Sequence, residues 1–211
     1  MKLIYKTALL LVTLIMLTLS PVFAGDNGAN EGQEFQIRDA DFSISGTSNV
    51  RDWEIKSETL TGVIRTGNAF LQTGEDGHAP ENWFEEVSLT IPANSLDSGI
   101  NTMNNTMHET LDSDENPEIT YYLESVESVR NGDGEQEYVL RIHGRAQAAG
   151  SYHQMTHEVI VVRENPQVFQ VTGEFEVRFS DFEMEPPSFM RGALKTGDEI
   201  EVRFRFTMGP K

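Results

Sequence analysis

From residue 34 onward, apolar residues recur mainly at every second position, which is the period of a β-strand with one buried face. The segment 171–179 is the clearest case, because four apolar residues and a glycine alternate strictly with Thr, Glu and Arg. Gly-containing turns at 131–134 and 148–150 separate such segments. The pattern predicts about eight to ten antiparallel strands joined by hairpins. Alternating or buried strand segments occupy 35–44 (bent, or two short strands), 53–64, 84–91, 119–123, 138–142, 158–162, 171–179 and 200–206.

One segment of the chain, residues 100–111, has a helical period instead. Its apolar residues share one helical face: Ile100, Met103, Met107 and Leu111. The remaining residues are mostly poor helix formers, so this helix needs a surface on which to dock. Asp97 or Ser98 is placed to cap its start, and Pro117 prevents it from continuing.

A sandwich and a barrel both fit this order of elements. Two features favour the barrel: aromatic residues dominate the inner face of the late strands, and a lone helix with an apolar stripe suits the closing of an open end. We therefore predict an all-β fold, an antiparallel barrel of about eight strands with one inserted helix covering it. Such a barrel is just wide enough to hold one small or slender ligand.

The first 24 residues indicate export. Lys2 and Lys6 precede a short apolar run, and small residues surround a cut near Ala24, as in a secretory signal peptide. We interpret 1–24 as this peptide, 25–33 as a disordered lead-in and 34–208 as one domain, located in the periplasm or outside the cell. The chain has no cysteine, which excludes disulfides, thiol chemistry and a lipid anchor on a cysteine at the cut.

The chain is strongly acidic, with a formal charge of −18 that becomes more negative once the two leader lysines are removed. Such a surface repels nucleic acid and anionic membranes. High solubility, or adaptation to high salt, is the simplest explanation, because the acids are spread along the chain. An acidic binding site is the alternative.

Motifs for chemistry are weak. His153 and His157 are four residues apart in a strand, roughly 13 Å, which is too far to share a metal ion. The acidic run 112–116 starts like a calcium loop, but Pro117 stands where Gly is needed and Leu123 where Glu is needed. No nucleophile elbow or phosphate cradle is present. We therefore expect no metal, no cofactor and no enzyme activity, although buried carboxylates of a hydrolase would be invisible in sequence.

Three stretches in order resemble one branch of the YceI-like family. Residues 46–53 (GTSNVRDW) resemble its G-T-S-x-x-x-D-W start, and 111–122 (LDSDENPEITYY) its helix end, acidic loop and Pro. Residues 182–199 resemble its tail, with a Pro pair followed by K-T-G-D-E. The likeness spans 34–208. It departs at Arg51, where His is expected, and at Arg191, which lies in a segment expected to be small and neutral and bears on what enters the tunnel mouth.

The resemblance implies a lipocalin-like barrel with an apolar tunnel that holds a long isoprenoid chain, such as a polyprenyl lipid or a quinone tail. Dimers are known in the family, so a homodimer is one expected assembly. Inward aromatic and Met side chains are the expected ligand contacts, since Met adapts to irregular apolar shapes: Phe42, Trp53, Met103, Met107, Tyr121, Phe175, Phe189, Met190 and Phe204.

Two of these assignments have simpler alternatives. Trp53 is more readily explained as a core aromatic at a strand start than as a floor for a ligand, with Asp52 accepting a backbone or indole hydrogen bond. Met103 and Met107 fit a helix packed on a core as well as a ligand lining. Besides lipid binding, a secreted hydrolase and a partner-binding protein with a filled core remain open at this stage.

Overall fold

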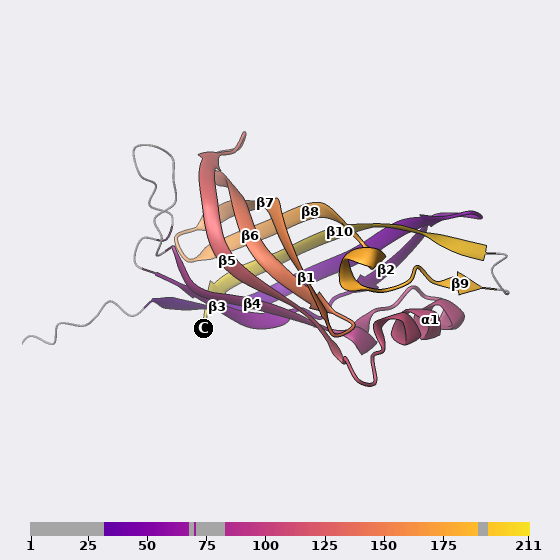
Figure 1. Ribbon diagram of the computed structural model, residues 1–211. Helices are drawn as coiled ribbons and strands as arrows, with labels where there is room; N and C mark the ends of the chain where they lie inside the picture. Colours follow the sequence, from indigo (N-terminus) through magenta and orange to yellow (C-terminus); the bar gives the residue numbers. More distant parts are fainter. Residues whose placement is uncertain (1–31, 68–69, 71–82, 190–193) are drawn as a thin grey trace, which may run out of the picture. The chain divides into compact units, whose positions relative to one another are not determined.

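The computed structural model describes residues 32–67, 70, 83–189 and 194–211, which form an antiparallel sheet with one α-helix and two short 3-10 helices (Figure 1). The strands are β1 Gln33–Ser48, β2 Trp53–Ser57, β3 Thr61–Thr66, β4 Phe84–Pro92, β5 Glu118–Asn131, β6 Glu137–Ala148, β7 Ser151–Asn165, β8 Val168–Arg178, β9 Ser188–Phe189 and β10 Leu194–Pro210. The helices are η1 Ala93–Ser95, α1 Asn101–Leu111 and η2 Phe179–Phe182. The expected signal peptide 1–24 and nearly all of the lead-in lie outside the described residues.

The sheet closes on itself. Eight strands form the ring in the order β1-β3-β4-β5-β6-β7-β8-β10, and β10 pairs again with β1. This last pairing is antiparallel and runs from Phe35 opposite Pro210 to Ser48 opposite Thr196. The short strands β2 and β9 lie outside the ring and pair only with β1 and β10, respectively. The predicted all-β barrel of about eight strands is confirmed.

β1 is one bent strand, and the bend lies at the break seen in the sequence. Its register with β10 shifts between Arg38 and Asp41. Asp39 has a φ of 48°, a left-handed conformation that Asp tolerates better than most residues. The bend lets β1 pair with β3 near Phe35 and with β2 beyond Phe42.

The two expected hairpin turns, at 148–150 and 131–134, agree with the prediction to different degrees. Ala149 and Gly150 both have positive φ, at 48° and 79°, and they form a tight turn between β6 and β7 where a turn was expected at 148–150. The turn at 131–134 is wider than expected, because β6 resumes only at Glu137. The positive φ falls on Gln136 and not on the glycines, so that part of the turn prediction was wrong.

The helix is present where it was predicted, but its cap is not. Ile100 occupies the N-cap position and offers no side-chain hydrogen bond. Asp97 and Ser98 instead hold the preceding loop, where Asn104 donates to Asp97 at 2.6 Å and accepts from Ser98 at 2.7 Å. The expectation that Asp97 or Ser98 caps the helix was therefore wrong. At the other end, Asp112 adopts a left-handed conformation that terminates the helix.

The two ends of the barrel are covered differently. At the end where β1 and β8 begin, Phe70 packs against four aromatic rings with centroids 5.3 to 6.0 Å apart. These rings belong to Phe35, Trp83, Phe84 and Phe169. The opposite end, where β4 and β8 finish, carries α1 and η2 (Figure 1). Aromatic packing closes one end, and helical segments cover the other.

Strand alternation assigns the two faces of the wall. On β7, for example, His157, Val159 and Val161 are buried, while the residues between them point outward. The outer face carries exposed ion pairs across neighbouring strands, such as Arg65 with Glu86 and Arg203 with Glu174. Exposed pairs of this kind each contribute about 0–1 kcal/mol. The stability of the barrel therefore comes mainly from its interior.

A glycine in β8 makes room for one inner ring. Gly173 lies opposite Phe204 of β10, and a Cβ atom at position 173 would come within 2.4 Å of that ring. We predict that Gly173→Ala lowers the free energy of unfolding by about 1–3 kcal/mol, because the ring has to move into less favourable packing. Urea denaturation measures the loss.

Gly209→Ala is the matched control for this substitution. A Cβ atom at position 209 meets nothing closer than 3.7 Å, so this variant should unfold close to the wild type. Equal stabilities of the two variants would contradict the packing described for Phe204.

Candidate ligand-binding cavity

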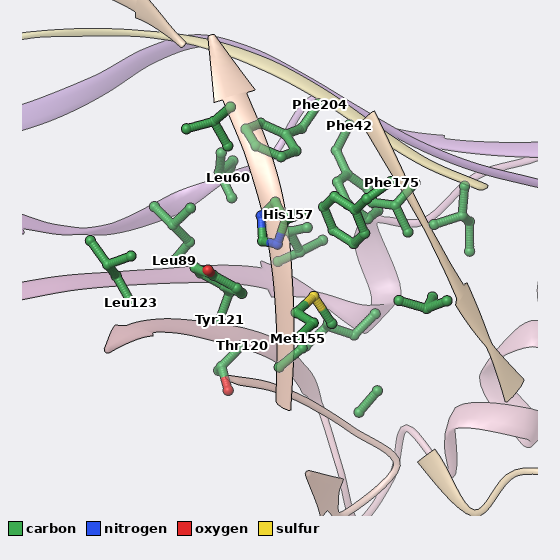
Figure 2. A pocket seen from close by; sticks show the side chains of 18 of the residues that line it. Phe42, Leu60, Leu89, Thr120, Tyr121, Leu123, Met155, His157, Phe175 and Phe204 are labelled. Atoms are coloured by element: carbon green, nitrogen blue, oxygen red, sulfur yellow. The ribbon is translucent and has the colours of Figure 1, made fainter. Parts of the chain in front are cut away.

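The barrel encloses an apolar cavity of about 200 Å³ (Figure 2). Its lining comes from all eight ring strands, with contributions from α1 and η2. Of the 33 described residues that line it, only Thr120, Tyr121 and His157 have polar side chains. A single buried water needs only roughly 10–15 Å³ of such space, so the cavity is far larger than a gap that one water would fill. The space is therefore an unfilled apolar chamber rather than a packing defect.

A second cavity of about 420 Å³ lies at the helical end. Its lining mixes apolar residues with polar ones, among them Arg51, Thr102 and Thr106. Two large apolar residues near this cavity are exposed, Val50 at 68% and Ile100 at 40% of their surface. Ile100 lines the cavity itself, and Val50 is the chain neighbour of the lining residue Arg51. We call this second space the mouth cavity and the first one the inner cavity.

Two side chains border both cavities. Met107 of α1 and Phe179 of η2 line the inner cavity and the mouth cavity alike. Both are nearly inaccessible to solvent, at 5% and 1% exposure. They stand between the two spaces, so any passage from the mouth to the interior runs past them.

The structure brings most of the sequence-predicted residues to these cavities. Phe42, Tyr121, Phe175 and Phe204 line the inner cavity, as Figure 2 shows, and Met107 lines both cavities. Trp53 and Met103 line the mouth cavity only. The side chain of Phe189, and all of Met190 and Arg191, lie outside the described residues.

Trp53 lies at the mouth with its indole held in place. Its Nε1 donates to the Thr47 carbonyl oxygen at 3.2 Å, and its ring packs 6.3 Å from Phe179. The acceptor of the indole N–H is thus Thr47 and not Asp52. Of the two donors expected for Asp52, a backbone N–H or the indole, the indole is therefore ruled out. Trp53 both anchors β2 and forms part of the mouth lining.

Two polar side chains face each other inside the apolar chamber. The rings of Tyr121 (β5) and His157 (β7) lie 5.6 Å apart and nearly edge to face. Among the residues that the structure describes, neither the Tyr121 hydroxyl nor Nδ1 of His157 finds a hydrogen-bond partner. Leaving a buried polar atom unpaired lowers the free energy of unfolding by about 1–3 kcal/mol, so this pair destabilises the interior when no ligand is bound.

Burial keeps both groups uncharged at neutral pH. It lowers the pKa of His157 to about 4, from an ordinary value near 6.5. Burial, helped by the nearby Glu124 carboxylate, raises the pKa of Tyr121 well above its usual range. Phe175 packs on the other side of His157, with ring centroids 4.3 Å apart. The imidazole is therefore neutral and held between two aromatic rings.

Thr120 does not join this pair, although its hydroxyl also lacks a partner. Alternation along β5 puts its side chain on the other side of the strand from Tyr121. Figure 2 shows the Thr120 hydroxyl pointing away from the imidazole.

Sequence reasoning tested His157 only as a metal ligand and missed its place in the cavity. The available signal was its position in the alternating series Met155, His157, Val159, Val161, all of which line the chamber. Among the described residues, no cluster of His, Asp or Glu has the arrangement of a metal site. No helix in the described part of the chain is long and apolar enough to cross a bilayer.

Comparison with known families decides the relationship. The YceI-like domain family matches residues 36–208, most of the chain. The chain belongs to the YceI-like family. No curated protein matches this YceI-like chain. The resemblance seen in its three sequence stretches is thereby confirmed.

Solved structures share the fold of this YceI-like protein at low sequence identity. A polyisoprenoid binding domain from Saccharophagus degradans, implicated in plant cell wall breakdown, is 12% identical with a TM-score of 0.61 and covers 84% of this chain and 98% of its own. BcnA of Burkholderia cenocepacia is 16% identical, with a TM-score of 0.58 and coverage of 80% and 95%. A Campylobacter jejuni YCEI protein is 13% identical, with a TM-score of 0.54 and coverage of 74% and 84%.

The buried imidazole predicts a pH-dependent stability. Between about pH 6.5 and about pH 4, His157 takes up a proton in the unfolded chain but not in the native barrel. The unfolded state then binds more protons, so the free energy of unfolding falls as the pH is lowered through this window. The slope from one such group is at most about 1.4 kcal/mol per pH unit.

His157→Leu should remove this contribution, and urea denaturation of both proteins across the window measures it. Other groups, such as Asp97 and Asp198, also have lowered pKa values, but they are common to both proteins and cancel in the difference. Parallel pH profiles for the wild type and His157→Leu would show that the imidazole is not held neutral.

Proposed function

We propose that this YceI-like protein is an exported binding protein that holds a long apolar isoprenoid-type lipid, a polyprenyl chain or a quinone tail, in its barrel. Storage, transport or stress protection of that lipid are the roles such binding would serve. The observation that carries the proposal is the inner cavity, whose lining is apolar at all but three residues. A structural neighbour described as a polyisoprenoid binding domain supports the choice of ligand class.

The chemistry of the lining suits a chain without charges. Burial of apolar ligand surface contributes roughly 25 cal/mol per Å² before ordering costs. None of the described residues that line the inner cavity is Lys, Arg, Asp or Glu. A branched hydrocarbon chain gains contact along its whole length there, whereas a charged ligand loses its hydration without finding a partner.

An empty chamber is costly to maintain. At about 24 cal/mol per Å³, an unfilled cavity of 200 Å³ corresponds to about 5 kcal/mol of lost packing. This is comparable to the whole net stability of many domains, about 5–15 kcal/mol. A bound lipid restores these contacts, so the proposal accounts for a cavity that a purely structural barrel would have no reason to keep.

The helical end offers the route of access. The mouth cavity lies between the exposed apolar side chain of Ile100 and the pair Met107 and Phe179. Met is flexible and adapts to irregular shapes, so Met107 is the side chain best suited to yield when a chain passes. Arg51 lines the same mouth, beside the path that an entering chain would take.

The two alternatives have less support. A hydrolase with buried carboxylates needs a carboxyl group at the site, and none of the described residues lining either cavity is Asp or Glu. A partner-binding protein with a filled core does not account for the inner cavity. We therefore propose binding without catalysis.

An organic extract of the purified protein, read by mass spectrometry, tests lipid binding directly. We expect an isoprenoid lipid close to one molecule per chain. We expect Met107→Glu to lose this lipid, because the substitution places a carboxylate between the two cavities, and Met103→Glu to reduce it less, because Met103 lines only the mouth.

Asn105→Glu is the matched control, since it adds the same charge on the exposed side of α1. It should retain the lipid as the wild type does, and circular dichroism should show all three variants folded. An empty wild-type protein, or full retention by Met107→Glu, would count against the proposal.

Export is the second part of the proposal and rests on the leader-like sequence of residues 1–24. We expect the chain expressed from its complete gene to accumulate outside the cytoplasm and to begin at Gly25. Amino-terminal sequencing of the exported protein checks the cut. An unprocessed cytoplasmic chain would contradict it.

A further inference from the structure

The pair Tyr121 and His157 is a polar feature that lipid binding by apolar contact does not use. The Tyr121 hydroxyl and Nδ1 of His157 are both buried and unpartnered. The side chains around them in the inner cavity are apolar, as Figure 2 shows for Leu89, Met155 and Phe204. A wall designed only for hydrocarbon would carry Phe and Leu at these positions.

The architecture of the wall brings the two side chains together. Tyr121 is on β5 and His157 on β7, with β6 between them. Gly144 of β6 has no side chain, and a Cβ atom there would come within 2.3 Å of the Tyr121 hydroxyl. The tyrosine ring therefore lies across β6 and reaches the neighbourhood of the imidazole, 5.6 Å between ring centroids.

The imidazole is fixed from its other side. Phe175 of β8 packs on it with a centroid distance of 4.3 Å and an interplanar angle of 36°. Phe175 has no polar atom to offer, so it orients the ring without satisfying it. The free hydrogen-bonding capacity of His157 at Nδ1 is left for whatever occupies the chamber.

The charge state of the pair selects the kind of partner. Burial keeps His157 neutral and Tyr121 protonated at neutral pH, and the described part of the inner lining holds no Lys or Arg. An anionic group, such as a diphosphate or a carboxylate, would find no countercharge there. An uncharged oxygen needs none.

We propose that Tyr121 and His157 form a hydrogen-bonding subsite for an uncharged oxygen, carbonyl or hydroxyl, carried by the apolar ligand. The inference rests on the proposed lipid binding and specifies which end of the ligand lies deep in the barrel. A carbonyl oxygen accepts from the Tyr121 hydroxyl and from an imidazole N–H. A hydroxyl group accepts from Tyr121 and donates to an unprotonated imidazole nitrogen. A plain hydrocarbon leaves both protein groups unpaired.

Binding of four probes that share one geranylgeranyl chain tests the subsite. The probes are the alcohol, a quinone carrying the chain, the plain hydrocarbon and the diphosphate. We expect the wild type to bind the alcohol or the quinone roughly tenfold or more tightly than the hydrocarbon, as one or two hydrogen bonds would give. The diphosphate should bind more weakly than the alcohol. The ratio of alcohol to quinone affinity tells whether the natural oxygen is a hydroxyl or a carbonyl.

Tyr121→Phe and His157→Leu should each weaken binding of the alcohol and the quinone much more than binding of the hydrocarbon, which removes most of this preference. Tyr121→Phe deletes a single oxygen atom and leaves the rest of the ring over Gly144. Tyr122→Phe is the matched control, because it deletes the same atom one residue further along β5, where the ring lies under Arg145 on the outer face. The control should keep the wild-type preference.

Two results would overturn the inference, and they separate it from the proposed function. If the wild type binds the hydrocarbon as tightly as the alcohol and quinone, or if Tyr121→Phe keeps the preference, lipid binding stands and the subsite is wrong. Such a result would mean that buried water serves the pair. If none of the four probes binds, the proposed function itself fails.

Discussion

The pairing of β1 with β10 is the interaction on which the rest of the structure depends. It joins the first and the last strand of the described chain over almost their whole lengths, from Phe35 opposite Pro210 to Ser48 opposite Thr196. Without it the sheet would have two open edges, and its apolar face would be accessible to water. With it, alternation along every strand divides residues into an interior and a surface. The inner cavity exists because this one seam closes.

The interior then has to meet two conflicting requirements. A tightly packed barrel core would be more stable, whereas a binding chamber has to leave space. The aromatic cluster around Phe70, together with the buried Trp83, fills the end away from α1. The helical end is left to Met107 and Phe179, which separate the chamber from the mouth. The aromatic side chains thus pack most tightly at the end of the barrel through which no ligand has to pass.

Much of this arrangement follows from local sequence. Period-two alternation identified Phe42, Phe175 and Phe204 as inward residues, because in a closed sheet the side of a strand is fixed by counting residues. The helical stripe identified Met103 and Met107 as docked. The stripe did not show that Met107 lies between the two cavities whereas Met103 lies only at the mouth, because this depends on how α1 lies across the end of the barrel.

Other features depend on contacts between distant residues, and local patterns do not contain them. Tyr121 and His157 lie on strands separated by β6, and they meet only because Gly144 lies between them. The expected cap at Asp97 or Ser98 failed for a similar reason. Both residues lie in the loop before α1 and are hydrogen-bonded by Asn104 of the helix itself, a competition that the spacing of residues alone does not show.

The glycines of the wall set the width of the barrel's interior. Over Gly144 and Gly173, the rings of Tyr121 and Phe204 lie in contact with bare backbone, so each ring lies flat along the wall instead of crossing the chamber. A methyl group at either position would push a ring inward and narrow the bore at that level. A single substitution at Gly144 or Gly173 can therefore change the width of the chamber without replacing any side chain that lines it, which gives this scaffold a simple way to adapt to thicker or thinner chains.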